Sequence, residues 1–253
     1  MNDPHIKALN YRIKHADHVD FDQASPLPHE EPSFSIYIEK GQAKITMKDH
    51  YPTREAARAE VDPFLRAWEL KATLDFDATD KFEFVFENAE IVDRMPTHGA
   101  LCAQGFADGD GFASADAHSQ RSKYPDPPVR LVVDGNVDLM LYCYRMYRED
   151  RRGLAEVAYF CLTVLEHSAG GRKPAAQSFG IALPVLSKLA LLSSEKGGRA
   201  ARKAIGAQSE FTDKERAWLE AVMKVIIRRA SEVAFDRKAN QKPITLADLP
   251  PLL

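Results

Sequence analysis

The chain lacks the short motifs that most often identify an enzyme. Its 253 residues contain no phosphate-binding loop, dinucleotide fingerprint, nucleophile elbow or zinc-ligand pattern, and they predict no cofactor. No apolar run approaches the ~18 residues that span a bilayer, and the first residues do not form a secretory signal. The three cysteines, Cys102, Cys143 and Cys161, are widely spaced and odd in number. Cys143 and Cys161 lie within apolar helical patterns. We therefore expect reduced core cysteines in a cytoplasmic protein that does not contact a membrane.

Charge is divided unequally along the chain. Residues 1–128 contain 14 Lys and Arg against 23 Asp and Glu, whereas residues 129–253 contain 20 against 14. Such asymmetry favours two domains with this boundary. The basic half is expected to contact either the acidic half, within one molecule or a dimer, or an anion such as nucleic acid. The modest excess of +6 favours the first interpretation.

The first half has the pattern of an α+β domain, an antiparallel sheet with one main helix. Apolar and polar residues alternate in segments that predict strands, at residues 5–14, 33–39, 43–48 and 81–93, with shorter candidates near 100–104 and 111–115. Helical spacing begins near Thr53, and Asp62-Pro63 inside it predicts a kink or two abutting helices. The proline-rich run at 124–128 cannot continue a helix or central strand, so the domain ends there.

The second half has the pattern of an all-α, four-helix-bundle-like domain. Helical spacing and caps predict main helices at 134–148, 153–168, 175–194 and 212–235, with a short basic helix at 199–206. Asp134 is the expected N-cap of the first, and Thr212-Asp-Lys-Glu215 forms a capping box at the start of the last. Between Leu154 and Leu165 only Glu156 and Thr163 are polar, so this helix must be buried on most of its faces. Pro184 is expected to kink the third helix unless it starts a new turn. The apolar tail at 244–253 is expected to pack back on the body.

The helix order resembles the HEPN superfamily over roughly residues 130–240. The resemblance rests on the buried Ala158-Tyr-Phe-Cys-Leu-Thr-Val-Leu-Glu166 helix and the later Lys224-Val-Ile-Ile-Arg-Arg229 helix. It implies a defence-related bundle akin to RNase toxins, phage abortive-infection proteins and their inactive relatives. The family's ribonuclease signature, an Arg followed about four to six residues later by a His, is absent from this half, where the only histidine is His167. The resemblance therefore implies a member without the usual chemistry.

One row of polar residues offers candidate catalytic groups. Arg152, Glu156, Tyr159, Thr163 and His167 recur at helical spacing, so they share one face of the buried helix. Glu156 and His167 have the chemistry of a general acid and base, with Arg152 beside them. The competing interpretation is a solvated face on which Arg152 pairs with Glu156, and such faces are far commoner than catalytic sites.

Clustered cations offer a candidate nucleic-acid surface. Basic residues gather at helix ends and in the loops between them, and those expected to bind phosphate are Arg199, Arg202, Lys203, Arg228 and Arg229. The alternative is that these cations stabilise helix C-termini.

Two acidic segments have some of the chemistry of metal sites. His15, Asp17 and His18 carry suitable ligands without an established spacing, and Asp108–Asp116 has the composition of a calcium loop without its bidentate glutamate. We therefore predict no metal site.

These observations favour a non-enzymatic binding or interaction protein with RNA or a protein partner. The alternative is a nuclease or other hydrolase that uses the polar row of the buried helix. A homodimer is expected through the first two bundle helices, because Tyr142, Cys143 and Met146 form an apolar face opposite Tyr144.

Overall fold

The chain divides into two compact units, Met1–Pro128 and Val129–Leu253. They are described separately from a computed structural model. The structure describes residues 3–16, 19–76, 81–95, 119–196, 210–237 and 242–252. The strands expected near 100–104 and 111–115 and the helix at 199–206 lie outside these residues.

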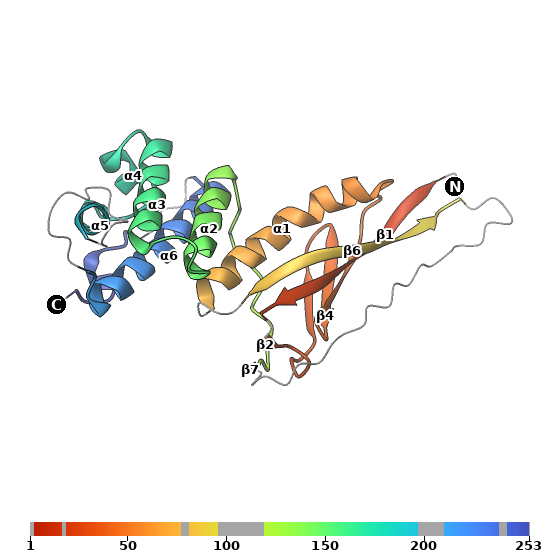
Figure 1. Cartoon of the computed structure of the whole chain (residues 1–253). Helices are drawn as coiled ribbons and strands as arrows, with labels where there is room; N and C mark the ends of the chain where they lie inside the picture. Colours follow the sequence, from red (N-terminus) through yellow and green to blue (C-terminus); the bar gives the residue numbers. More distant parts are fainter. Residues whose placement is uncertain are drawn as a thin grey trace. The chain divides into compact units, whose positions relative to one another are not determined.

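The N-terminal unit is a five-stranded antiparallel sheet with one long helix, α1 (Arg54–Asp75) (Figure 1). The strand order is β3 (Leu27–Glu30), β4 (Phe34–Glu39), β5 (Gln42–Met47), β1 (Pro4–His15) and β6 (Phe82–Asp93). A short parallel pair joins β2 (Val19–Asp20) to β7 (Ser119–Gln120). The predicted α+β class and the four longer strands are confirmed, whereas β3 was missed.

Alternation along the strands builds the core of this unit. Leu9 and Ile45 are opposite one another on β1 and β5, and neither is exposed. Val61 and Trp68 of α1 are equally buried and belong to the same apolar cluster. One face of the sheet is therefore covered by the helix, as expected of an antiparallel sheet with one apolar face.

α1 is a single helix that continues through Pro63, so the alternative of two abutting helices is wrong. Asp62 does not cap a second helix. Its carboxylate accepts hydrogen bonds from the Tyr11 hydroxyl at 2.7 Å and from the Arg58 guanidinium at 2.9 Å. These contacts tie the helix to β1 next to the proline, where the backbone lacks an N–H donor. The expected start is confirmed, because the Thr53 side chain accepts from the N–H of Ala56.

A buried carboxylate connects α1 to the edge of the sheet. Glu69 is 4% exposed, and its side chain accepts from the backbone N–H of Phe84 at 2.8 Å and from Arg66 at 2.9 Å. Since β6 is an edge strand, an N–H that points away from β1 has no neighbouring strand to bond. Glu69 supplies the missing acceptor.

The C-terminal unit is helical and is organised around α3 (Leu154–Ala169). This helix packs against α2 (Gly135–Arg148), α4 (Arg172–Ser178), α5 (Leu183–Glu195) and α6 (Asp213–Phe235) (Figure 1). The prediction that α3 is buried on most of its faces is confirmed, and the all-α class of this half is confirmed with it.

The segment predicted as a third helix forms two helices, α4 and α5. Gly180, with φ +57°, lies between them, and Pro184 stands in the first turn of α5. Of the two expectations for Pro184, the start of a new turn is the one observed, because its missing N–H would have no helical partner there.

The caps and the tail of this unit agree with the sequence. Thr212 and Glu215 form the predicted capping box of α6. The N–H of Ile244 bonds the carbonyl of Gly180, and the N–H of Ala182 bonds the carbonyl of Ile244, both at 2.8 Å. The tail therefore packs back on the unit, and it adds a short 3-10 helix, η2 (Leu246–Asp248).

We expect Glu69→Ala to lower the free energy of unfolding of the N-terminal unit by about 2 kcal/mol, because it leaves the Phe84 N–H buried without an acceptor. Each unit contains one buried tryptophan, Trp68 or Trp218. Urea unfolding in a Trp218→Phe background, followed by fluorescence of Trp68, isolates the unit that contains Glu69.

Two variants control for this effect. Glu69→Gln keeps an acceptor for the N–H and should lose less stability, while Glu55→Ala on the exposed first turn of the same helix should change little. Equal losses for Glu69→Ala and Glu55→Ala would contradict a special role for Glu69.

Candidate functional site

The predicted catalytic row is a solvated strip on α3. Arg152 lies 3.7 Å from Glu156 and also donates to Sγ of Cys143 at 3.3 Å. The Thr163 hydroxyl is bonded to the carbonyl of Tyr159, one turn earlier in the same helix. Half of the Glu156 side chain is exposed. These contacts match the interpretation in which Arg152 pairs with Glu156.

Glu156 and His167 are not brought together. At ~1.5 Å per residue, the helix places them about 16 Å apart along its axis. A general acid and base must both reach the reacting group within hydrogen-bonding distance, directly or through one water. The geometry therefore offers no shared substrate atom to this pair.

The predicted phosphate-binding cations are only partly described, since Arg199, Arg202 and Lys203 lie outside the described residues. Arg229 contacts Glu232 at 3.0 Å and donates to the carbonyl of Lys242 at 2.9 Å, and its side chain is only 14% exposed. Its guanidinium thus holds the segment after α6 against the helix. Arg228 is half-buried.

The predicted dimer face is partly wrong, because Cys143 is 2% exposed and belongs to the core of the helical unit. Burial raises the pKa of its thiol and that of Cys161. Met146 is half-buried, whereas Tyr142 is 55% exposed and Leu139 is 46% exposed on the same helix. Of the predicted face, Tyr142 stays exposed, and Leu139 lies exposed on the same helix.

No metal-ligand cluster of three or more His, Cys, Asp or Glu occurs among the residues that the structure describes. His15 is described, but Asp17, His18 and the acidic segment Asp108–Asp116 are outside that range.

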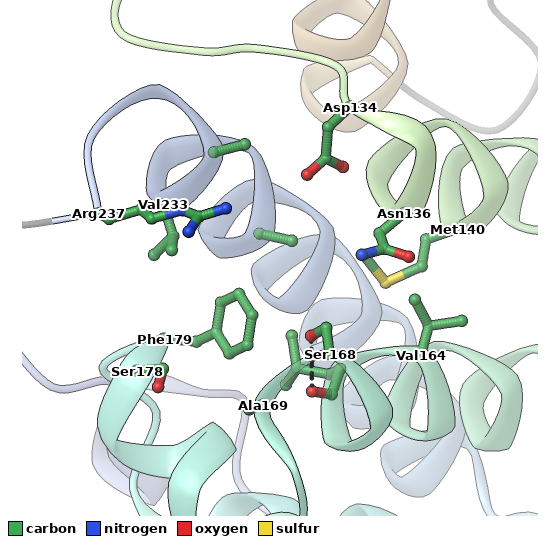
Figure 2. A pocket seen from close by; sticks show the side chains of 13 residues that line it. Asp134, Asn136, Met140, Val164, Ser168, Ala169, Ser178, Phe179, Val233 and Arg237 are labelled. Atoms are coloured by element: carbon green, nitrogen blue, oxygen red, sulfur yellow. Dashed lines mark hydrogen bonds between the residues drawn. The ribbon is translucent and has the colours of Figure 1, made fainter.

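A hollow of about 350 Å³ lies in the helical unit where several helices begin or end (Figure 2). α2 begins at its mouth, while α3, α4 and α6 end around it. Its lining residues come from all four helices and their caps: Asp134, Asn136, Met140, Val164, Leu165, Ser168, Ala169, Ser178, Phe179, Ala230, Val233, Ala234 and Arg237.

The hollow has an apolar floor and a polar rim. Met140, Leu165 and Ala230 are buried, and Phe179 and Val233 are half-buried beside them. The exposed polar residues are Asp134, Asn136, Ser168, Ser178 and Arg237. An apolar cavity with a few converging polar groups is the usual form of a small-molecule site, and helical bundles often form such sites between their helices.

Local sequence signals position the walls. Asp134 is the N-cap of α2, and its carboxylate accepts from the N–H of Val137 at 2.9 Å, which fixes that side chain at the mouth. Gly170, with φ +81°, ends α3 directly after the wall residues Ser168 and Ala169. At the rim, the backbone therefore holds the Asp134 carboxylate in place, and Gly170 sets the point where the wall formed by α3 ends.

Sequence reasoning missed this site. Asp134 was predicted only as a helix cap, and Arg237 lies just after the predicted end of the last helix at residue 235. Neither residue signals a cavity, because the convergence of helix ends from distant parts of the sequence is a tertiary property.

The N-terminal unit has a second hollow of about 460 Å³ between the start of α1 and the edge strand β6. Its charged residues include Arg54 and Glu55, which pair with each other at 2.8 Å. It is wider and shallower than the hollow in the bundle, so we consider the latter the better candidate.

Comparison with protein-family models, curated proteins and solved structures finds no match. The resemblance to the HEPN superfamily therefore stays a prediction. Within the described helices, none is long and apolar enough to cross a membrane.

We expect the purified chain not to cleave RNA, with Mg²⁺ or with EDTA, because Glu156 and His167 do not converge. A gel assay with single-stranded and hairpin RNA checks this. Cleavage that persists in Glu149→Ala but is lost in both Glu156→Ala and His167→Ala would restore the hydrolase alternative.

Proposed function

We propose that this protein is a non-enzymatic binding protein and that the hollow in its helical unit holds the ligand. The observation that carries the proposal is the pairing of a buried apolar floor with a rim of polar groups. The volume, about 350 Å³, is at the lower end of the range for ligand pockets. A small molecule with an apolar part fits this chemistry.

The arrangement of the other candidate residues supports binding over catalysis. The polar row on α3 lies outside the set of residues that line the hollow, and Arg152 of that row is held by Glu156. No general base of that row faces the apolar floor. A ligand held in the hollow would meet hydrogen-bonding groups and one ion of each sign at the rim.

Two described cations of the helical unit, Arg229 and Arg172, give little support to RNA binding. Arg229 is engaged by Glu232 and Lys242, and Arg172 contacts Glu166 at 2.5 Å. RNA affinity depends on cations that can neutralise phosphates, and these cations already have partners. An RNA or protein partner and a cytoplasmic location remain predictions, as does membership of the HEPN superfamily.

A homodimer also remains a prediction. The surface that supports it is the pair of exposed apolar side chains on α2, Leu139 and Tyr142. Two side chains form a small patch compared with the 20–30 residues per partner of a typical stable interface.

We expect a neutral aromatic probe, 2-phenylethanol, to bind the full chain with a Kd of about 1 mM, a weak affinity consistent with its few atoms. Ala234→Leu fills the hollow from α6 and should weaken binding about tenfold or more. Titration by ligand-detected NMR measures both values.

Ala221→Leu is the matched control, because it makes the same change on the same helix at a half-buried position that does not line the hollow. Circular dichroism must show that both variants fold. Equal affinities for the two variants, or no binding by the parent chain, would contradict the proposed site.

A further inference from the structure

The mouth of the hollow carries opposite charges on two sides. Asp134 enters from the start of α2, and Arg237 enters from just beyond the end of α6 (Figure 2). The carboxylate and the guanidinium both point toward the space above Phe179. A charged ligand would therefore meet an ion of each sign at once.

Both charged side chains keep hydrogen-bonding capacity for a ligand. Asp134 accepts one backbone N–H through Oδ1, and a carboxylate has acceptor sites for several more donors. Within the described part of the chain, no ion pair holds the guanidinium of Arg237, whose residue is exposed. Arg229 on the same helix, by contrast, is fixed by Glu232.

We infer that the hollow binds a small zwitterion with an apolar side chain, the chemical class of the apolar amino acids. The ligand carboxylate would face Arg237, the ammonium would face Asp134, and the side chain would lie on the apolar floor beside Phe179 and Val233. This inference rests on the proposed function, since it names the ligand class of the same hollow.

Charge complementarity favours a zwitterion over a ligand that carries only an acid or only an amine. A plain carboxylic acid would satisfy Arg237 but would bring a second negative charge near Asp134. A plain amine would satisfy Asp134 but would bring a positive charge near Arg237. Repulsion between like charges of the ligand and the site lowers the affinity of the wrong ligand, and this adds to the specificity that favourable contacts give.

Three probes separate the two charges while keeping one apolar body. L-phenylalanine carries both groups, 3-phenylpropanoate lacks the ammonium, and 2-phenylethylamine lacks the carboxylate. Titrations of the full chain in low salt should show L-phenylalanine binding about three- to tenfold more tightly than either analogue, as expected for partly exposed charges.

Two isosteric variants assign the charges. Arg237→Gln should weaken L-phenylalanine and 3-phenylpropanoate by a similar factor and leave 2-phenylethylamine unchanged or tighter. Asp134→Asn should do the reverse, and it preserves the fold because Asn caps a helix as well as Asp does. Arg151→Gln, at an exposed site away from the hollow, should change none of the three affinities.

The outcomes distinguish the inference from the proposed function. If all three probes bind alike and neither variant changes the order, the zwitterion inference is wrong but the apolar hollow still binds. If a single charge dominates, the ligand class is an acid or an amine, and the inference is also overturned. If neither these probes nor 2-phenylethanol bind, both the zwitterion inference and the proposed function are wrong.

Discussion

The helical unit depends on the burial of one helix, α3. Leu154, Val157, Cys161 and Leu165 each have almost no exposed surface, and other helices pack around them. Removing such apolar surface from water is the main favourable term in folding, at about 25 cal/mol per Å². Most polar side chains of α3 lie on one strip, from Glu156 to His167, while Glu166 and Ser168 near its end lie outside that strip.

The hollow follows from the same packing. Other helices cover α3 along its length, so a ligand reaches its surface where those helices begin or end. Gly170 ends α3 and Asp134 starts α2 at the same place, and the N–H of Val137 holds the Asp134 carboxylate there. A side chain that the backbone already holds, as it holds Asp134, loses less entropy when a ligand binds.

Much of the fold was predictable because its signals are local. Alternation marks β1, β4, β5 and β6, and the capping box at Thr212 marks α6. The strand β3 escaped detection because Leu27–Glu30 is short and contains a proline. The sequence did not decide whether 175–194 forms one kinked helix or two helices. Pro184 kinks a helix that already precedes it but starts a new helix where none does.

The candidate site was much less predictable, and the reasons are tertiary. Helical spacing places Glu156 and His167 on one face, and a rise of ~1.5 Å per residue already separates them too far to cooperate. What the sequence did not show is the hollow, which forms where helix ends from distant parts of the chain converge. Asp62 precedes a proline, a pattern typical of a helix cap, but its carboxylate accepts hydrogen bonds from Tyr11 and Arg58 instead. Cys143 was predicted both as a core residue and as part of the dimer face, and its burial confirms only the first prediction.

The most direct test of the proposed site is the NMR signal of a methyl group inside it. The chain has six methionines, of which Met140 lines the hollow and Met223 is buried in the same unit away from it. With methyl-¹³C methionine and Met140→Leu to assign the peak, saturation with L-phenylalanine should shift the Met140 signal and leave that of Met223 in place. An unmoved Met140 signal under saturating ligand would contradict the account.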